Sequence, residues 1–219
     1  MVNEGTEEYR GRIKVPSRGI CHIYNAWHNR LEPIDSSPDG TGTSLFVRIE
    51  PRKSFAVVFG ETADWPVYEM PAFMGAGIPI TGWKRSLCAS IDYPTFGPAC
   101  PVAIPDSLAE ERPGFSGFAR YEARFYLEYQ KPVMLEITNA AEGLEIFVNG
   151  VSAGIQIILP YCYDLSGMVQ KGENRLVIEV ATTLERERSV NMTNPTEKAI
   201  AGEPSCGSGI TGTVFLKYE

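Results

Sequence analysis

The sequence predicts an all-β protein built mainly as an antiparallel β-sandwich. Apolar and polar residues alternate in short segments, which recur at roughly ten-residue spacing after residue 115. The chain has 21 glycines and 16 prolines in 219 residues, a content typical of many strands joined by tight turns. Its 10 Phe, 10 Tyr and 3 Trp also favour sheets. No long segment has the periodicity of an amphipathic helix.

The alternation predicts a series of strands in the second half of the chain. Within residues 119–128, Tyr121 and Ala123 lie on one face, while Glu122 and Arg124 lie on the other. One apolar face is typical of an antiparallel strand whose other side meets solvent. The predicted strands are 119–128, 133–138, 144–148, 151–159, 175–181 and 213–216.

Polar and glycine-containing turns separate these strands. Asn149-Gly150 is the strongest hairpin signal, because a type I′ turn needs positive φ at both of its central residues. Asp164 is placed to accept backbone N–H bonds and to cap the short turn that follows it. Gly172 and Asn174 form the turn before the next strand. We interpret all of these residues as structural.

The N-terminal part of the chain has a different pattern. Residues 44–49 and 54–59 alternate around a polar turn, which predicts a hairpin. Residues 35–43 are small, polar and turn-forming and predict a loop, and residues 1–20 predict a frayed arm or an edge segment. For residues 20–31, periodicity leaves a strand and a helical turn both open.

Two proline-rich stretches, 61–80 and 92–114, predict surface connections rather than regular structure. Since an isolated hairpin is at best marginally stable, the N-terminal hairpin either packs on the rest of the chain or completes a sheet in a neighbouring domain. We therefore predict that residues 1–80 are a partial β segment and linker from a preceding domain. Residues 81–219 then form the complete β-sandwich.

The charge balance argues against several partners. The formal charge is −7 at pH 7, the pI is near 5.0, and lysines and arginines form no cluster. Nucleic-acid binders usually carry a basic face, and anionic membranes attract basic segments, so we expect neither partner. No apolar run approaches the roughly 20 residues of a membrane-spanning helix. The acidic and polar first 12 residues do not resemble a signal peptide, and the compartment stays open.

Few residues suit catalysis or metal binding. The chain has 2 histidines, His22 and His28, so any histidine-based site must use one of them. Residues 114–118, GFSGF, approach a nucleophile elbow but have Phe118 where a glycine is needed. We predict no catalytic residue, no metal ligand and no cofactor, although a structural calcium ion is compatible with a β-sandwich.

The cysteines are scattered along the chain with no CxxC pair. This arrangement favours ordinary thiols over a disulfide scaffold or a structural zinc site. The five residues are Cys21, Cys88, Cys100, Cys162 and Cys206.

An ordered set of motifs covers residues 80–219. It comprises the aromatic strand FSGFARYEARFYLE, the hairpin LEIFVNGVSAG, the run PYCYDLSGMVQKGENRLVIEVATTL and the closing SGITG, after an opening strand WKRSLCAS. In this order and spacing, the motifs resemble the jelly-roll sugar-binding domain of family 2 glycoside hydrolases and of rhamnosidase-like enzymes. The resemblance implies a galactose-binding-domain-like jelly roll, with the catalytic acids in a separate (β/α) barrel. The N-terminal SLFVRIEPRKSFAVVF is similar to the closing strands of the β-domain that precedes this jelly roll.

Aromatic residues outside the strand interiors are the candidates for binding a sugar. Sugars stack their apolar ring faces on Trp or Tyr, while neighbouring polar groups bond the hydroxyls. For each candidate, the alternative is packing at the edge of the core, because Trp and Tyr are commonly part-buried. The candidate sugar-binding residues are Trp83, Tyr93, Tyr161 and Tyr163, with Trp65, Tyr68 and Phe96 in a wider set.

These observations predict a non-catalytic accessory module of a glycoside hydrolase, with a scaffold or carbohydrate-binding role in carbohydrate metabolism. Its expected partner is the catalytic barrel domain of the same parent chain, with carbohydrate as a second candidate. The alternative is a stand-alone carbohydrate-binding module, or an adhesion or protein-interaction module that uses an exposed sheet edge.

Overall fold

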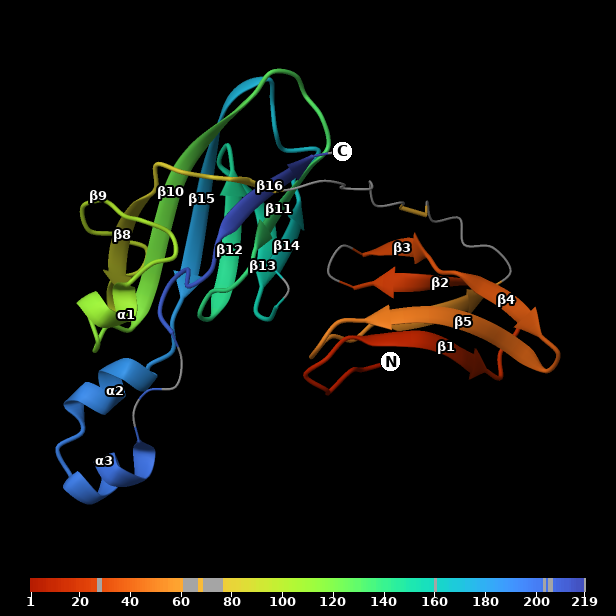
Figure 1. Ribbon diagram of the computed structural model, residues 1–219, viewed down its shortest axis with the longest axis horizontal. Helices are drawn as coiled ribbons and strands as arrows, with labels where there is room; N and C mark the ends of the chain where they lie inside the picture. Colours follow the sequence, from red (N-terminus) through yellow and green to blue (C-terminus); the bar gives the residue numbers. More distant parts are fainter. Residues whose placement is uncertain are drawn as a thin grey trace. The chain divides into compact units, whose positions relative to one another are not determined.

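The computed structural model divides the chain into two compact units, Met1–Pro71 and Ala72–Glu219. Figure 1 shows that both units are built mainly from strands. The division falls ahead of the predicted boundary at residues 80 and 81, because β7 (Ile78–Pro79) pairs with a strand of the second unit. The structure describes residues 1–26, 29–60, 67–68, 77–159, 161–202, 204 and 207–218.

The N-terminal unit contains two three-stranded antiparallel sheets. One has the order β1-β5-β4 and the other β3-β2-β6. Their buried side chains include Cys21, Leu45 and Val47, which share one small core. The strands are β1 (Tyr9–Val15), β2 (Ile20–Asn25), β3 (Arg30–Pro33), β4 (Ser36–Asp39), β5 (Gly42–Ile49) and β6 (Ala56–Gly60).

The hairpin predicted for residues 44–49 and 54–59 is wrong. β5 pairs with β1 and β4, whereas β6 pairs with β2, so the two strands belong to different sheets. Leu45 and Val57 still pack in one core, as the alternation requires. Alternation identifies the buried face of a strand but not its partner, and here the two faces meet across the core.

Part of the loop predicted at residues 35–43 is a strand. β4 pairs with β5 through the turn at Gly40, whose φ of +51° suits a glycine. Pro38 is tolerated in β4 because that strand is the edge of its sheet. β1 is also an edge strand, which agrees with the edge segment predicted within residues 1–20. For residues 20–31, where a strand and a helical turn were both open, Ile20–Asn25 forms the strand β2. The predicted connection 61–80 lies largely outside the described residues, at 61–66 and 69–76.

Two antiparallel sheets form the C-terminal unit. The larger has the order β13-β12-β15-β10-β8-β9, and the smaller has the order β14-β11-β16-β7. The larger sheet contains β8 (Lys84–Ala89), β9 (Cys100–Pro101), β10 (Gly117–Leu127), β12 (Gly143–Val148), β13 (Val151–Gln156) and β15 (Gly172–Ala181). The smaller contains β7, β11 (Val133–Ile137), β14 (Tyr161–Asp164) and β16 (Val214–Tyr218).

Both sheets of this unit contribute to a single apolar core. Burial alternates along β10, β12 and β16, as expected for strands with one face inward. The predicted all-β sandwich is therefore confirmed. The fully buried large side chains include Tyr121, Leu127, Leu135, Ile137, Leu144, Ile146, Leu165, Leu176, Ile178 and Ile210.

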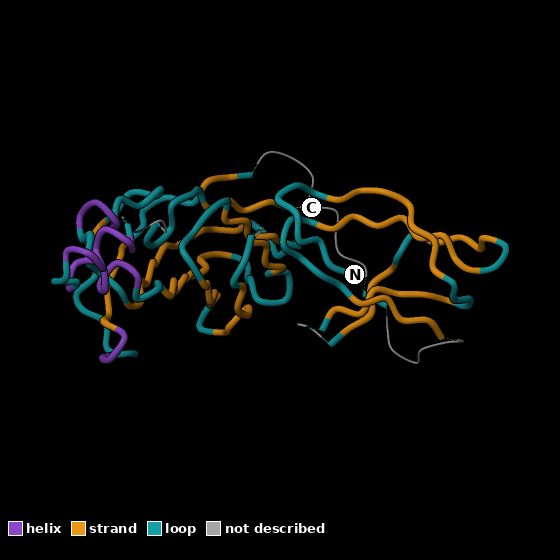
Figure 2. Tube along the Cα trace, turned by 90° about the horizontal axis from the view of Figure 1, so that it is seen from below, coloured by secondary structure: helices purple, strands orange, loops and turns teal. Residues whose placement is uncertain are grey.

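The helical content of the described chain is small and lies in the C-terminal unit, and Figure 2 draws it in purple. A 3-10 turn spans Ser90–Asp92, and α1 spans Leu108–Glu111. Between β15 and β16 lie α2 (Glu185–Asn191) and α3 (Pro195–Ala201), which the sequence pattern did not indicate. Asn194 caps α3, since its side chain accepts from the backbone N–H of Thr196 at 3.0 Å.

One side chain links the edge strands of the two sheets. Gln156 ends β13, and its amide nitrogen donates to the carbonyl of Cys162 in β14 at 2.6 Å. Its amide oxygen accepts from the backbone N–H of Cys162 at 3.1 Å. A glutamine amide therefore occupies both backbone groups of one residue in β14, as a neighbouring strand would.

The turns around β12 and β15 are joined through asparagine side chains. Asn149 and Gly150 have φ values of +52° and +86°, as a type I′ turn requires. Asn149 donates to Asn174 Oδ1 at 2.9 Å and accepts from the backbone N–H of Arg175 at 3.0 Å. Asn174 is fully buried, and its side chain also bonds the backbone of Gln170 in both directions at 2.8 Å. The turn after Asp164 is closed by that carboxylate, which accepts from the N–H of Ser166 at 3.0 Å.

We expect Asn149→Ala to lower the free energy of unfolding by about 2 kcal/mol, because it removes several hydrogen bonds and places an alanine at positive φ. Asn149→Gly removes the same bonds without the backbone strain and should lose less. Urea unfolding followed by tryptophan fluorescence measures both changes. Equal midpoints for the parent and Asn149→Ala would contradict the structural role.

Candidate functional site

Three of the four candidate sugar-binding residues lie in the core. Trp83, Tyr161 and Tyr163 are each 3% exposed. Trp83 Nε1 donates to the carbonyl of Ile80 at 2.8 Å, and Tyr161 donates to the carbonyl of Glu142 at 2.7 Å. The expectation that these three rings stack on a sugar does not fit their burial, since core side chains cover them. Edge-of-core packing, the alternative for each, describes them better.

The remaining aromatic and histidine candidates fall in different places. Tyr68 is half-buried, and the Arg30 guanidinium lies 3.6 Å from its ring centroid in the N-terminal unit. His22 stands on β2, opposite Val58 of β6. Trp65 and His28 lie outside the described residues.

Tyr93 is the candidate that stays accessible, and the residues around it form a defined patch. It follows the 3-10 turn after β8 and is 44% exposed. Its ring centroid lies 4.3 Å from that of Phe118 and 6.1 Å from that of Phe96. Its hydroxyl donates to Glu179 Oε2 at 3.1 Å. We call Tyr93, Phe96, Phe118, Arg120, Glu145 and Glu179 the Tyr93 patch.

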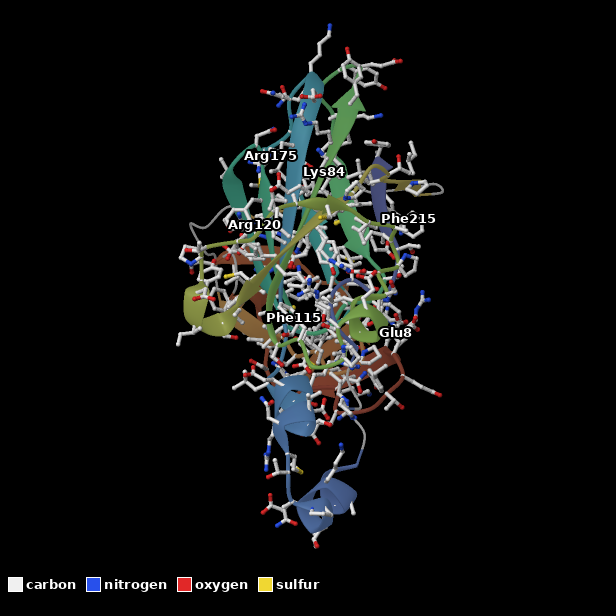
Figure 3. The ribbon with its side chains drawn as sticks, turned by 90° about the vertical axis from the view of Figure 1, so that its left-hand side faces the viewer. Glu8, Lys84, Phe115, Arg120, Arg175 and Phe215 are labelled. Carbon is white, nitrogen blue, oxygen red and sulfur yellow. The ribbon has the colours of Figure 1, made fainter. Side chains whose placement is uncertain are left out.

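A charged pair forms the centre of the Tyr93 patch. Arg120 Nε and Nη2 contact Glu179 Oε1 at 2.8 and 2.7 Å. The guanidinium also lies 3.7 Å from the ring centroid of Phe96, a favourable cation–π arrangement. The Glu179 side chain is only 7% exposed, and its charge is compensated by Arg120. Figure 3 labels Arg120 together with Lys84 and Arg175, which come from neighbouring strands of the same sheet.

The strand register explains why these side chains meet. Arg120 of β10 lies opposite Glu179 of β15, and Glu179 lies opposite Glu145 of β12. Side chains directly opposite one another share a face, so the three project from the outer face of the six-stranded sheet. Partial burial, and then the hydrogen bond and charge of Glu179, raise the pKa of Tyr93.

A second polar cluster, around Asp106, lies inside the sandwich. Tyr121 donates to Asp106 Oδ2, and Arg85 Nη1 contacts Asp106 Oδ1 at 2.6 Å. Arg85 Nη2 also contacts Glu111 Oε2 at 2.5 Å. Burial, the hydrogen bond to Asp106 and the charge of Asp106 raise the pKa of Tyr121 far above its usual range, so it stays neutral. Ile210 N donates to the Tyr121 hydroxyl at 3.3 Å, which binds the SGITG segment to the sheet.

The Asp106 cluster has a structural role. Asp106 and Tyr121 are buried, with hydrogen bonds to protein groups on both side chains. Gly209 approaches so closely that a Cβ there would lie 2.0 Å from the Tyr121 hydroxyl oxygen. A substrate therefore finds no room at this point. No sequence pattern pointed to this cluster, because Arg85, Asp106 and Tyr121 come from separate segments.

No catalytic or metal-binding constellation stands out among the residues that the structure describes. Ser116, the serine of the elbow-like GFSGF, is buried, and its hydroxyl accepts from the N–H of Glu187 at 3.2 Å. Within the described ranges, no group of three or more His, Cys, Asp or Glu is placed to hold a metal ion. The same part of the chain contains no helix long and apolar enough to cross a membrane.

The described cysteines fit the expectation of ordinary thiols. Cys21, Cys88, Cys100 and Cys162 form no disulfide within the part of the chain that the structure describes. Cys21 and Cys88 are buried, whereas Cys100 is exposed. Cys206 lies outside the described residues. These positions therefore add no candidate site.

Solved structures resemble this fold. The match to a rhamnosidase from Novosphingobium sp. PP1Y has a TM-score of 0.77 and 21% sequence identity, and covers 100% of this chain but 22% of the rhamnosidase. A β-glucuronidase from Faecalibacterium prausnitzii matches with a TM-score of 0.50 and 15% identity, over 69% of this chain and 33% of its own. No protein-family model matches the sequence, and no curated protein matches it. The chain thus shares its fold with β domains of these two enzymes, and it spans 22% and 33% of their lengths.

We expect Tyr121→Phe to lower the free energy of unfolding by about 2 kcal/mol, because Asp106 loses a buried hydrogen-bond donor. Tyr126→Phe is the matched control, since Tyr126 is 68% exposed on the same strand. It should change stability by less than about 0.5 kcal/mol. Denaturant unfolding of the three proteins measures both changes, and equal effects of the two substitutions would contradict the prediction.

The Arg85–Glu111 contact predicts a pH dependence of stability. The hydrogen bond from Arg85, and then that from Ser107, lowers the pKa of Glu111 below its usual range. The stabilisation is therefore complete above the unfolded pKa of about 4.3 and is lost as pH falls through the lower folded value. The difference in unfolding midpoint between the parent and Glu111→Gln should shrink as pH falls below about 4.3. A difference that stays constant from neutral to acid pH would rule this out.

Proposed function

We propose that this chain is a non-catalytic accessory module of a glycoside hydrolase, with a jelly-roll, galactose-binding-domain-like sandwich in a scaffold or carbohydrate-binding role. One observation carries the proposal. The match to the rhamnosidase covers 100% of this chain and only 22% of that enzyme, so the same fold is one part of a larger protein there. A part of that size leaves room for a separate catalytic domain.

The roles of the carboxylates support the absence of catalysis. Glycoside hydrolysis needs two facing carboxyl groups, one of which has a raised pKa so that it can donate a proton. In the described C-terminal unit, Asp106, Glu111, Glu122, Glu173 and Glu179 each contact an arginine. The pKa of Glu111 is lowered, which is the opposite of what a general acid needs.

The proposed partner is the catalytic barrel domain of the same parent chain. A sandwich with its own core can pack against such a barrel as a rigid scaffold, because its stability does not depend on the partner. The strongly ordered turns around Asn149 and Asn174 would keep the surface of the module fixed.

Two observations favour functions beyond a scaffold. The half-exposed ring of Tyr93, beside Arg120 and Glu179, is suited to carbohydrate. The exposed side chains Val151 and Ile155 on β13, an edge strand, suit an adhesion or protein-interaction role.

The test of the accessory role is an activity assay. We expect the purified chain to release no nitrophenol from a panel of nitrophenyl glycosides, with a commercial rhamnosidase as the positive control. Turnover that disappears on an acid-to-amide substitution, such as Glu110→Gln or Glu136→Gln, would overturn the proposal. Turnover that survives all such substitutions would point to a contaminating enzyme.

A further inference from the structure

We propose that the Tyr93 patch binds a neutral sugar and discriminates against carboxylated sugars. The inference rests on the accessory function proposed above and gives it a site and a ligand class. It combines three properties of the patch, which are a fixed aromatic ring, an unused hydrogen-bond donor and an excess of negative charge.

The Tyr93 ring is held in place before any ligand arrives. One contact is with Phe118, at 4.3 Å between ring centroids, and another is the hydrogen bond from the Tyr93 hydroxyl to Glu179. With 44% of the residue exposed, these contacts leave part of Tyr93 open to a ligand. A ring that is already ordered loses little conformational entropy when the apolar face of a pyranose stacks on it.

Arg120 supplies hydrogen-bond donors next to that ring. A guanidinium has five N–H donors. Arg120 uses Nε and Nη2 on Glu179, so Nη1 stays available for a ligand within the described part of the chain. The side chain is 28% exposed, which allows sugar hydroxyls to reach it. Stacking of Arg120 on Phe96 fixes the direction of these donors.

The charge of the patch selects against anions. Arg120 and Glu179 neutralise each other, and Glu145, directly opposite Glu179, adds a second carboxylate. The charges of Glu179 and Glu145 raise the pKa of Tyr93 and the charge of Arg120 lowers it, and at the Tyr93 ring the two carboxylates outweigh the guanidinium. A carboxylated sugar on this ring would therefore be repelled, whereas a neutral sugar would not.

Cations elsewhere on the sheet do not reverse this balance. Lys84 of β8 pairs with Glu122 rather than with Arg120, and Arg175 of β15 pairs with Arg124, further along the same strand. Arg175 contacts Glu122 at 2.6 Å, and Lys84 lies opposite Glu122 in the register. Both cations thus lie beside Glu122, which is not part of the Tyr93 patch.

The experiment is a titration of the full chain with three methyl glycosides, monitored by NMR and calorimetry. The neutral probes are methyl α-L-rhamnopyranoside and methyl β-D-galactopyranoside, and the anionic probe is methyl β-D-glucuronide. We expect at least one neutral glycoside to bind with a Kd of about 1 mM. The glucuronide should bind about tenfold more weakly at low salt, because of the two carboxylates.

Substitutions locate the site. Tyr93→Ala should weaken binding of the neutral glycoside about tenfold, whereas Tyr93→Phe keeps the ring and should change it little. Tyr126→Ala removes an exposed tyrosine of β10 that is not part of the Tyr93 patch, and it should leave binding unchanged. Glu145→Gln should bring the affinity for the glucuronide closer to that of the neutral glycosides.

Each outcome bears on the inference. Equal binding of the glucuronide and the neutral glycosides overturns the selection by charge, and unchanged binding by Tyr93→Ala overturns the site. Failure of both neutral glycosides to bind at tens of millimolar overturns the inference as a whole. The proposed accessory function is overturned by a different result, which is hydrolysis of a glycoside by the chain itself. The two failures are therefore distinguishable.

Discussion

The carboxylate of Asp106 is the point on which the C-terminal sandwich depends. It lies fully buried, where a charge without partners would be costly, and it accepts hydrogen bonds from Tyr121 and Arg85. Its own backbone N–H donates to the carbonyl of Ile210 at 2.7 Å. One residue thus joins β8, β10 and the segment before β16. Removal of one partner of such a buried pair typically costs about 3–5 kcal/mol, so Asp106 couples the three segments energetically.

Local signals in the sequence predicted much of the sandwich. Alternation in β10, β12 and β15 identified the buried faces, and Asn149-Gly150 identified the turn, because both depend on neighbouring residues only. The partner of a strand depends on contacts far along the chain. For this reason the β5–β6 hairpin prediction was wrong although both strands exist.

The same distinction applies to the candidate site. Residue type alone could not separate Tyr93 from Tyr161 and Tyr163, since all are tyrosines near turns. Exposure separates them, because Tyr93 lies on the loop between β8 and β9, while the other two point inward from β14. The Arg120–Glu179 pair was likewise hidden, since those residues are distant in the sequence and meet only through the register of β10 and β15. A charged pair on neighbouring strands is visible only when the register is known.

The amide of Gln156 has a consequence for the behaviour of the chain at high concentration. Edge strands with free backbone groups recruit strands from other molecules, which is a route to aggregation. Because Gln156 holds both backbone polar groups of Cys162, that part of β14 is closed to an incoming strand. A β-sandwich must avoid such pairing wherever many copies meet, and a single glutamine protects this edge without adding a charge or a proline.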